Sequence, residues 1–233
     1  MATGSVPDAA EDGVVADRTV VFVDLAGFTA LTEVHGDREA VDLVDRFVSL
    51  AEQALGAGDR LVKSIGDAVM VAAPDPAAGL ELLRRLLAGC YATAGFPVPR
   101  AGLHHGPVIE RGGDLFGATV NLAARVAGQA HGGQVLGTDP VAKVAHQAGV
   151  ATVDLGTFEL KNVGEPVNLH EIDVGSAPAG GAIDPVCRMH VDRKDAAGRL
   201  RYCEADWWFC SLGCAAQFAA EPERFAREHE PDR

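Results

Sequence analysis

A stretch of fourteen residues, "RLVKSIGDAVMVAA" (60–73), constrains the fold more than any other part of the chain. Its two apolar runs flank Gly66-Asp67, an arrangement typical of two antiparallel strands joined by a tight turn. Helical patterns stand on both sides of it. Apolar residues recur at helical spacing over 38–55, and "PAAGLELLRRLLAGCYATAG" begins a second helix at Pro76. A hairpin between two helices leaves few possible orders for the strands of a sheet.

The remaining pattern completes a mixed sheet. The sequence predicts strands at 19–24, at 100–105 and at 108–111, the last two as a pair, and then a helix over 119–130. A short helix and two or three strands follow, up to Ile172. This order is that of a split βαβ, ferredoxin-like unit. We therefore predict an α+β fold with a mainly antiparallel sheet, covered by helices on one face.

Composition divides the chain into four regions. Residues 1–17 are small, acidic and aperiodic, which predicts a disordered tail. The main domain is expected over 18–174, and "GSAPAGGA" (175–182) is typical of a flexible linker. The last region, 183–229, carries both tryptophans and four of the five cysteines, so we expect a second, small Cys-rich domain there.

Charge and hydropathy exclude several classes of partner. The formal net charge of -13 disfavours binding to nucleic acid or to an anionic membrane, because both would repel the protein. The apolar runs are shorter than the roughly 20 residues that a membrane span needs. The first residues also lack the basic and apolar regions of a signal peptide. We expect a cytoplasmic protein with no membrane span and no nucleic-acid partner.

Two aspartates stand where a charge needs an explanation. Asp24 closes the apolar run 20–23, and Asp67 lies in the turn of the predicted hairpin. If the two strands are neighbours, the carboxylates converge and repel each other unless a cation is bound, and oxygen ligands suit Mg²⁺ or Mn²⁺. Gly27 and Phe28 would let the chain turn there and bring backbone amides close to a bound anion. The alternative is structural: Asp24 as a helix N-cap and Asp67 as an ordinary turn residue.

A second polar feature interrupts the helix predicted over 119–130. Asn121 and Arg125 are four residues apart, so they share one face of a helix that is otherwise small and apolar. A guanidinium beside an amide suits the binding of a phosphoryl group and a sugar. A solvent-exposed polar stripe is the alternative.

Three segments together resemble a known family. "VVFVDLAGFTALTE", "LVKSIGDAVMV" and "GDLFGATVNLAARV" are similar, in the same order, to the signature motifs of the class III nucleotidyl (adenylate and guanylate) cyclase catalytic domain, over about 18–174. The resemblance implies a metal site, two residues that recognise the base, one that positions the ribose and one that stabilises the transition state. The resemblance assigns the metal site to Asp24, Leu25 and Asp67. It assigns base recognition to Lys63 and Asp114, the ribose to Asn121 and the transition state to Arg125.

The resemblance also extends to the phosphates and to assembly. It implies that Phe28, Thr29 and Lys161 bind the substrate, although Asn162 stands where the family usually has glycine. It implies two Mg²⁺ or Mn²⁺ ions per active site, with ATP as substrate. In the family, metals come from one chain and base and transition-state residues from the other. A homodimer with active sites at the subunit interface is therefore expected.

Base choice follows from hydrogen bonding. Adenine offers an acceptor at N1 and a donor at N6, and these complement a lysine donor and an aspartate acceptor. Guanine offers the opposite pattern and would leave Lys63 and Asp114 mismatched. The expected reaction is therefore ATP to 3′,5′-cyclic AMP and pyrophosphate. A guanylate cyclase is the runner-up, and a catalytically silent nucleotide-binding or metal-sensing dimer is a further alternative.

The C-terminal region resembles the YHS (TRASH-like) metal-binding domain through "DPVCRMHV" and "WWFCSLGCAAQF". Arg188 stands where the family usually has glycine. The resemblance carries over to Cys187, Cys210 and Cys214, and such thiols suit Zn²⁺ or a copper-type ion. Cys203 is either a fourth ligand or a free thiol, and His190 is a weaker candidate. A packed knuckle with buried, metal-free cysteines is the alternative. We expect metal or redox state at this domain to regulate the enzyme.

Overall fold

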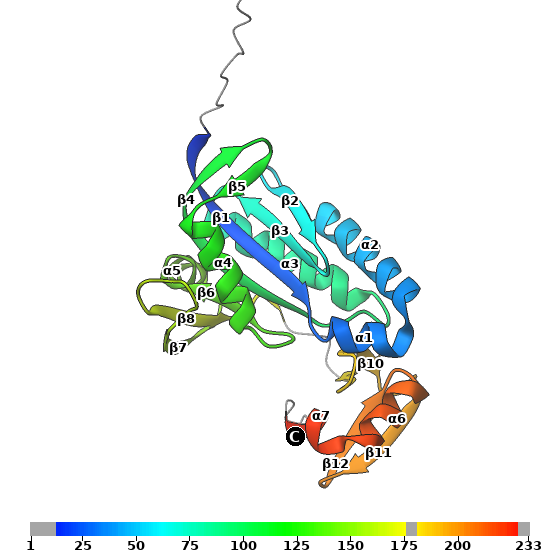
Figure 1. Ribbon diagram of the computed structural model, residues 1–233. Coiled ribbons are helices and arrows are strands. Elements are labelled where there is room, and N and C mark those ends of the chain that lie inside the picture. Colours follow the sequence, from blue (N-terminus) through cyan, green and yellow to red (C-terminus); the bar gives the residue numbers. More distant parts are fainter. Residues whose placement is uncertain (1–12, 176–180, 228–233) are drawn as a thin grey trace, which may run out of the picture.

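The computed structural model describes residues 13–175 and 181–227 (Figure 1). Its main sheet has eight strands in the order β2-β3-β1-β4-β6-β8-β7, with β5 paired to β4. Among the pairs of this sheet, β4 and β6 are parallel and the others antiparallel. The strands are β1 (Val14–Leu25), β2 (Arg60–Ile65), β3 (Ala68–Ala73), β4 (Pro99–Arg111), β5 (Asp114–Phe116), β6 (Val135–Thr138), β7 (Thr152–Phe158) and β8 (Val167–Ile172).

Helices cover both faces of this sheet. They are α1 (Phe28–His35), α2 (Asp37–Ala54), α3 (Pro76–Ala92), α4 (Ala118–Gln129) and α5 (Asp139–Gln147). The alternation of β1 separates the layers, because successive side chains of a strand point to opposite faces. Val21 and Val23 join the core under α2, α3 and α5, whereas Val20 packs with Ala123 of α4 on the other face. The predicted fold class is confirmed, but helices lie on both faces rather than on one.

Three predicted boundaries were wrong. Residues 14–17 belong to β1 rather than to a tail, because they pair with 107–110 of β4. The two strands expected at 100–105 and 108–111 are one continuous strand, β4. Pro107 lies between the segment of β4 that pairs with β6 and the segment that pairs with β5. None of the described strands pairs with β4 on that side at this residue, so the missing N–H of proline costs no hydrogen bond there. The expected linker is shorter, since residues 181–182 belong to β9. Its residues 176–180 and the predicted tail residues 1–12 lie outside the described part of the chain.

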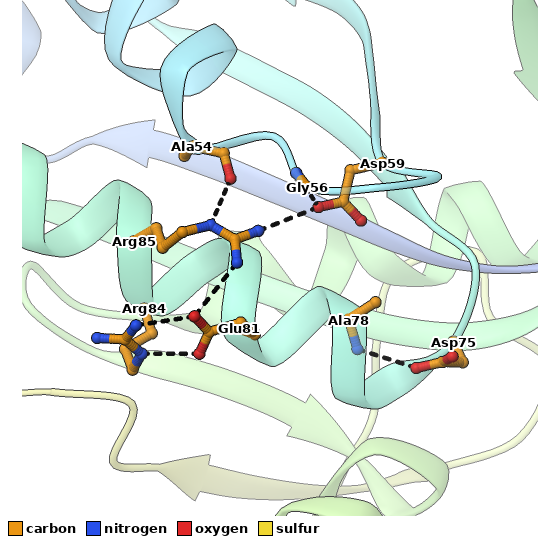
Figure 2. A network of polar contacts seen from close by, with 8 residues as sticks. All are labelled: Ala54, Gly56, Asp59, Asp75, Ala78, Glu81, Arg84 and Arg85. Carbon is orange, nitrogen blue, oxygen red and sulfur yellow. Dashed lines mark hydrogen bonds and ion pairs between the residues drawn. The ribbon is translucent and has the colours of Figure 1, made fainter.

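A polar network joins the loop before β2 to α2 and α3 (Figure 2). Arg85 of α3 donates from Nε to the carbonyl of Ala54 at 2.7 Å, which satisfies an orphan carbonyl at the end of α2. Its Nη2 lies 3.3 Å from Asp59 Oδ2, which also accepts from the Gly56 amide at 2.7 Å. The network therefore holds the loop between α2 and β2 against α3.

The C-terminal module packs on the main domain. Its elements are β9 (Gly181–Ile183), β10 (His190–Asp192), β11 (Gly198–Tyr202), β12 (Ala205–Phe209), α6 (Leu212–Ala220) and α7 (Pro222–Arg227). One continuous apolar cluster runs from the main core to this module, where Trp207 and Phe218 lie buried. The Val98 amide donates to the Arg188 carbonyl at 2.9 Å, and the His190 amide to the Phe96 carbonyl at 3.0 Å. Over residues 13–175 and 181–227, no helix has both the length and the apolar character that a membrane crossing requires.

Candidate active site and cysteine cluster

The two predicted carboxylates meet at the end of β1. Asp24 closes the strand, and the turn of the β2–β3 hairpin lies beside it, since the Leu25 amide donates to the Asp67 carbonyl at 3.3 Å. Burial raises the pKa of the Asp67 carboxyl, and the neighbouring negative charge of Asp24 raises it further. Two like charges held this close suit a divalent cation with oxygen ligands, so the residues fit the Mg²⁺ or Mn²⁺ expected from the sequence.

Arg100 is a site residue that the sequence did not reveal. It lies directly opposite Asp24 in the β1–β4 pair, and its Nε and Nη2 donate to Asp24 Oδ2 at 2.8 and 2.5 Å. Its positive charge lowers the pKa of Asp67, against the larger effects of burial and Asp24. Only the register of β1 and β4 brings this arginine to the carboxylates, and no local pattern around residue 100 indicates it.

The turn after β1 presents the first turn of α1. Gly27 adopts a left-handed conformation with φ of 73°, and a Cβ there would lie 2.4 Å from Arg188 Cγ of the C-terminal module. Phe28 and Thr29 follow in the first helical turn, where backbone N–H groups have no partner within the helix. A cleft at this place is lined in part by Thr29, Arg100 and Arg188. Backbone donors and guanidinium groups at one cleft suit a polyphosphate.

The two predicted base-recognising residues contact each other. Lys63 Nζ lies 2.6 Å from Asp114 Oδ2, and the Lys63 hydrogen bond lowers the pKa of the Asp114 carboxyl. An irregularity of the β2–β3 register between Leu61 and Lys63 marks a bulge at this point. Bulges redirect side chains next to functional sites. The structure therefore brings together a donor and an acceptor that are 51 positions apart in the sequence.

Asn121 and Arg125 lie on the exposed side of α4, while Ala123 and Val126 face the sheet. This helix packs closely on β4 at Gly102, where a Cβ would lie 2.0 Å from the Ala127 nitrogen. Within the described ranges, neither polar side chain has a hydrogen bond or ion pair. Both are therefore directed to solvent from a rigid support.

Lys161 lies in a segment beside α4, since the adjacent Leu160 shares an apolar cluster with Val126 of that helix. It is exposed in the connection between β7 and β8. The next residue, Asn162, has a φ of 63°. This left-handed conformation explains why an asparagine is accommodated where the family usually has glycine, because both residues tolerate it.

The family model of the adenylate and guanylate cyclase catalytic domain matches residues 14–172, which include all of these residues. The chain belongs to this family. A second family model, the YHS domain, matches residues 182–229.

Curated relatives and solved structures agree with this assignment. The chain is 36% identical over 166 residues to a pH-sensitive adenylate cyclase of Mycobacterium tuberculosis, covering 70% of this chain and 42% of that protein. It is 40% identical over 128 residues to an adenylate cyclase of Streptomyces griseus, covering 54% of this chain and 32% of that one. It thus spans less than half the length of these relatives.

Among solved structures, an adenylate cyclase of Trypanosoma brucei, described in its monomeric state, aligns with a TM-score of 0.62 at 22% identity. That alignment covers 70% of this chain and 89% of the other. The adenylyl cyclase CyaB of P. aeruginosa aligns with a TM-score of 0.59 at 20% identity, covering 69% and 95%. These likenesses establish the fold of the cyclase domain.

Three of the predicted cysteines cluster in the C-terminal module. Cys187 Sγ lies 3.3 Å from Cys210 Sγ, which lies 3.7 Å from Cys214 Sγ. Cys203 is not part of this cluster. It is exposed in the turn between β11 and β12, with φ of 48°, so the turn carries its thiol away from the other three. His190, on β10, is also outside the group, and the fourth member is His35 of α1, which the sequence did not indicate.

Electrostatics shows why three thiols at this spacing favour a cation. Hydrogen bonds from Cys187 and Cys210 lower the pKa of the Cys214 thiol. Hydrogen bonds to Cys210 and Cys214, together with burial, raise the pKa of the Cys187 thiol. Each thiolate therefore opposes ionisation of the next, and a bound metal ion removes that opposition because it binds thiolates directly.

The raised pKa of Asp67 gives a prediction about stability. The pKa of Asp67 is higher in the folded protein than in the unfolded chain. The stability that this carboxyl adds at acid pH is therefore lost as the pH rises through its pKa in the folded state. We expect Asp67→Asn to raise the Tm of the metal-free protein at pH 7.5 by roughly 1–2 °C, after discounting for solvent screening. Thermal unfolding in chelator would measure this. Added Mn²⁺ should stabilise the wild type more than the variant, and a lower Tm for Asp67→Asn in chelator would contradict the expectation.

Proposed function

We propose that the protein is an adenylate cyclase that converts ATP to 3′,5′-cyclic AMP and pyrophosphate. The observation that carries the proposal is the convergence of Asp24 and Asp67 at the end of β1, beside the first turn of α1. The Lys63–Asp114 pair, whose side chains lie 2.6 Å apart, supports adenine as the base that the site selects. The curated relatives named adenylate cyclases support the same reaction.

The residues divide the chemistry among them. Two divalent cations held by Asp24, Asp67 and the Leu25 carbonyl would activate the ribose 3′-hydroxyl and offset triphosphate charge. Arg125 would donate to the α-phosphate, where negative charge grows during in-line attack. Asn121 would hold the ribose so that the 3′-oxygen faces the phosphorus. The backbone amides of Phe28 and Thr29, with Lys161, would bind the β- and γ-phosphates.

Adenine selection gives a prediction on specificity. Lys63→Met keeps the length of the side chain and removes its donor, so Asp114 loses its partner and adenine N1 loses a hydrogen bond. We expect kcat/KM for ATP to fall about 100-fold, with a smaller change for GTP, as for loss of a hydrogen bond that a site was built to make. Lys143→Met, at an exposed position of α5, is the matched control. An unchanged ratio of ATP to GTP turnover would remove Lys63 from base recognition.

We also propose a homodimer with shared sites. Asp24 and Asp67 lie together at the end of β1, beside Arg100 of the same chain. Arg125 instead faces solvent from α4. Exposed apolar side chains gather where β1 begins and where β4 and β5 pair, and burying them in a dimer would be favourable. They are Val14, Val15, Ile109 and Phe116.

For the C-terminal module, we propose that Cys187, Cys210 and Cys214 bind a soft metal ion such as Zn²⁺ or a copper ion, and that its occupancy or thiol oxidation alters turnover. Three sulfur atoms in a buried cluster support this. Turnover of the reduced protein with and without Zn²⁺ or Cu⁺, in the wild type and in Cys210→Ser, tests the regulatory part. Equal rates throughout would leave the module without a regulatory role.

The test of the main proposal is product formation by the purified full chain with Mn²⁺, with ATP and GTP offered separately. Cyclic AMP from ATP, with little product from GTP, is the expected result. Cyclic GMP as main product would make it a guanylate cyclase. No product from either nucleotide, in a protein that binds both, would favour a silent nucleotide-binding dimer.

A further inference from the structure

The cyclase domain itself contributes to the cysteine cluster. His35 is the last residue of α1, and its Nε2 lies 3.5 Å from Cys210 Sγ and 3.9 Å from Cys214 Sγ. The four possible ligand atoms, one from each residue, all lie within 4.8 Å of one another. The imidazole is only 13% exposed, and Cys187 and Cys214 are fully buried. A histidine from one domain therefore completes a group of three thiols from the other.

The distances match a tetrahedral site. With Zn–S bonds of about 2.3 Å and a Zn–N bond of about 2.0–2.1 Å, the edges of a tetrahedron are about 3.8 Å between sulfurs and about 3.6 Å between sulfur and nitrogen. Two of the three sulfur pairs lie at 3.3 and 3.7 Å, two of the three sulfur–nitrogen pairs lie at 3.5 and 3.9 Å, and the remaining pairs lie within 4.8 Å. Small shifts of side chains would therefore accommodate one Zn²⁺ ion in a Cys₃His arrangement.

Neighbouring groups hold these ligands in orientation. His35 Nδ1, the nitrogen away from the cluster, lies 4.0 Å from the Glu39 carboxylate one turn along the chain. This is longer than a hydrogen bond, and a small rotation of the exposed Glu39 side chain would let it accept the Nδ1 proton and orient the imidazole. The buried Asp184 carboxylate accepts from the backbone amides of Cys187, at 3.3 Å, and Cys210, at 2.8 Å. These bonds tie the two segments that carry the thiols to each other.

A bound metal ion accounts for more of these contacts than a disulfide or a metal-free core does. A disulfide between Cys187 and Cys210 would leave the Cys214 thiol and the His35 nitrogen without a common partner. A metal-free apolar core is disfavoured because an imidazole nitrogen directed at three sulfurs makes only weak hydrogen bonds there. A cavity lined by His35, Glu39, Cys210 and Ser211, among others, also gives an ion a path to the cluster.

We propose that His35 is the fourth ligand of a Zn²⁺-class ion bound by Cys187, Cys210 and Cys214, and that this ion joins the C-terminal module to helix α1. The inference rests on the proposed cysteine metal site and adds the ligand from the cyclase domain. Its consequence is mechanical. Phe28 and His35 are the two ends of α1, about 10 Å apart along a rigid helix. The ion would bind α1 at His35, and the proposed phosphate-binding turn lies at the other end of the same helix, at Phe28.

Cobalt binding to the full-length protein tests the assignment without any use of activity. Reduced apoprotein is titrated with Co²⁺, which reports tetrahedral coordination through visible d–d bands and thiolate ligands through near-ultraviolet charge transfer. We expect wild type to bind one ion tetrahedrally, and His35→Ala to bind it at least about 100-fold more weakly with altered d–d bands, because a ligand is lost. His35→Cys should restore tetrahedral binding, with about one third more charge-transfer intensity from four thiolates than from three. His146→Ala, at an exposed position of α5, and Cys203→Ser are the controls.

The outcomes separate the two levels of the proposal. Failure of the wild type to bind Co²⁺ or Zn²⁺ overturns the cysteine site as well. Equal affinity and an equal spectrum in wild type and His35→Ala leave the cysteine site and overturn the role of His35. Hydrogen exchange tests the link to α1: Zn²⁺ should slow exchange of α1 amides in wild type and not in His35→Ala, and equal protection in both would overturn that link.

Discussion

Asp24→Asn should lower the rate of cyclic AMP formation by about 1,000-fold or more, while the protein keeps its fold. Asparagine has the same shape and accepts one hydrogen bond from Arg100, so the β1–β4 pair is preserved. The change removes one of two negative charges that hold divalent cations. Asp67 then stands alone as a single carboxylate whose pKa is still raised by burial, so it is a poor cation site. Initial rates with saturating Mn²⁺ and ATP measure the effect.

The matched control is Asp17→Asn, which makes the same change at an exposed position of the same strand. It should leave the rate within about twofold, because a surface substitution away from the site has little effect. Circular dichroism and gel filtration would show that both variants fold and assemble alike. Activity of Asp24→Asn within tenfold of the wild type would exclude Asp24 as an essential metal ligand.

A heterodimer of Asp24→Asn and Arg125→Ala should recover about half of the wild-type rate, although each homodimer is nearly inactive. Arg125→Ala alone should lose about 100- to 1,000-fold, since it removes the donor to the charge that develops in the transition state. If each site takes its carboxylates from one chain and its arginine from the other, one site of the heterodimer carries both defects. The second site carries neither.

Co-expression of two differently tagged chains and purification through both tags gives the heterodimer. The control heterodimer combines Asp24→Asn with Asp67→Asn, which places one carboxylate defect in each site and should recover nothing. Recovery in the first pair and not in the second would establish sites shared between subunits. A first heterodimer no more active than its homodimers would mean that Asp24 and Arg125 act within one chain.

Local sequence patterns predicted the cyclase fold well because they reflect short-range physics. The hairpin turn at Gly66-Asp67 and the apolar face of α4 are set by residues near one another in the chain. The boundaries were less accurate where pairing decided them. The start of β1 at Val14 depends on pairing with β4. The continuity of β4 through Pro107 depends on where its other neighbours, β5 and β6, pair with it.

The sequence by itself determined the chemical groups of the proposed nucleotide site: the carboxylates Asp24 and Asp67, the Lys63–Asp114 pair, and Asn121 with Arg125. These residues lie in contiguous motifs whose spacing can be read directly. Only the tertiary structure placed Arg100 on Asp24 and His35 on the cysteines. In the first case β-sheet register makes the contact, and in the second the packing of two domains joins residues 175 positions apart. Contacts of this kind depend on the whole fold, because no local preference in the chain encodes which distant segment will lie beside them.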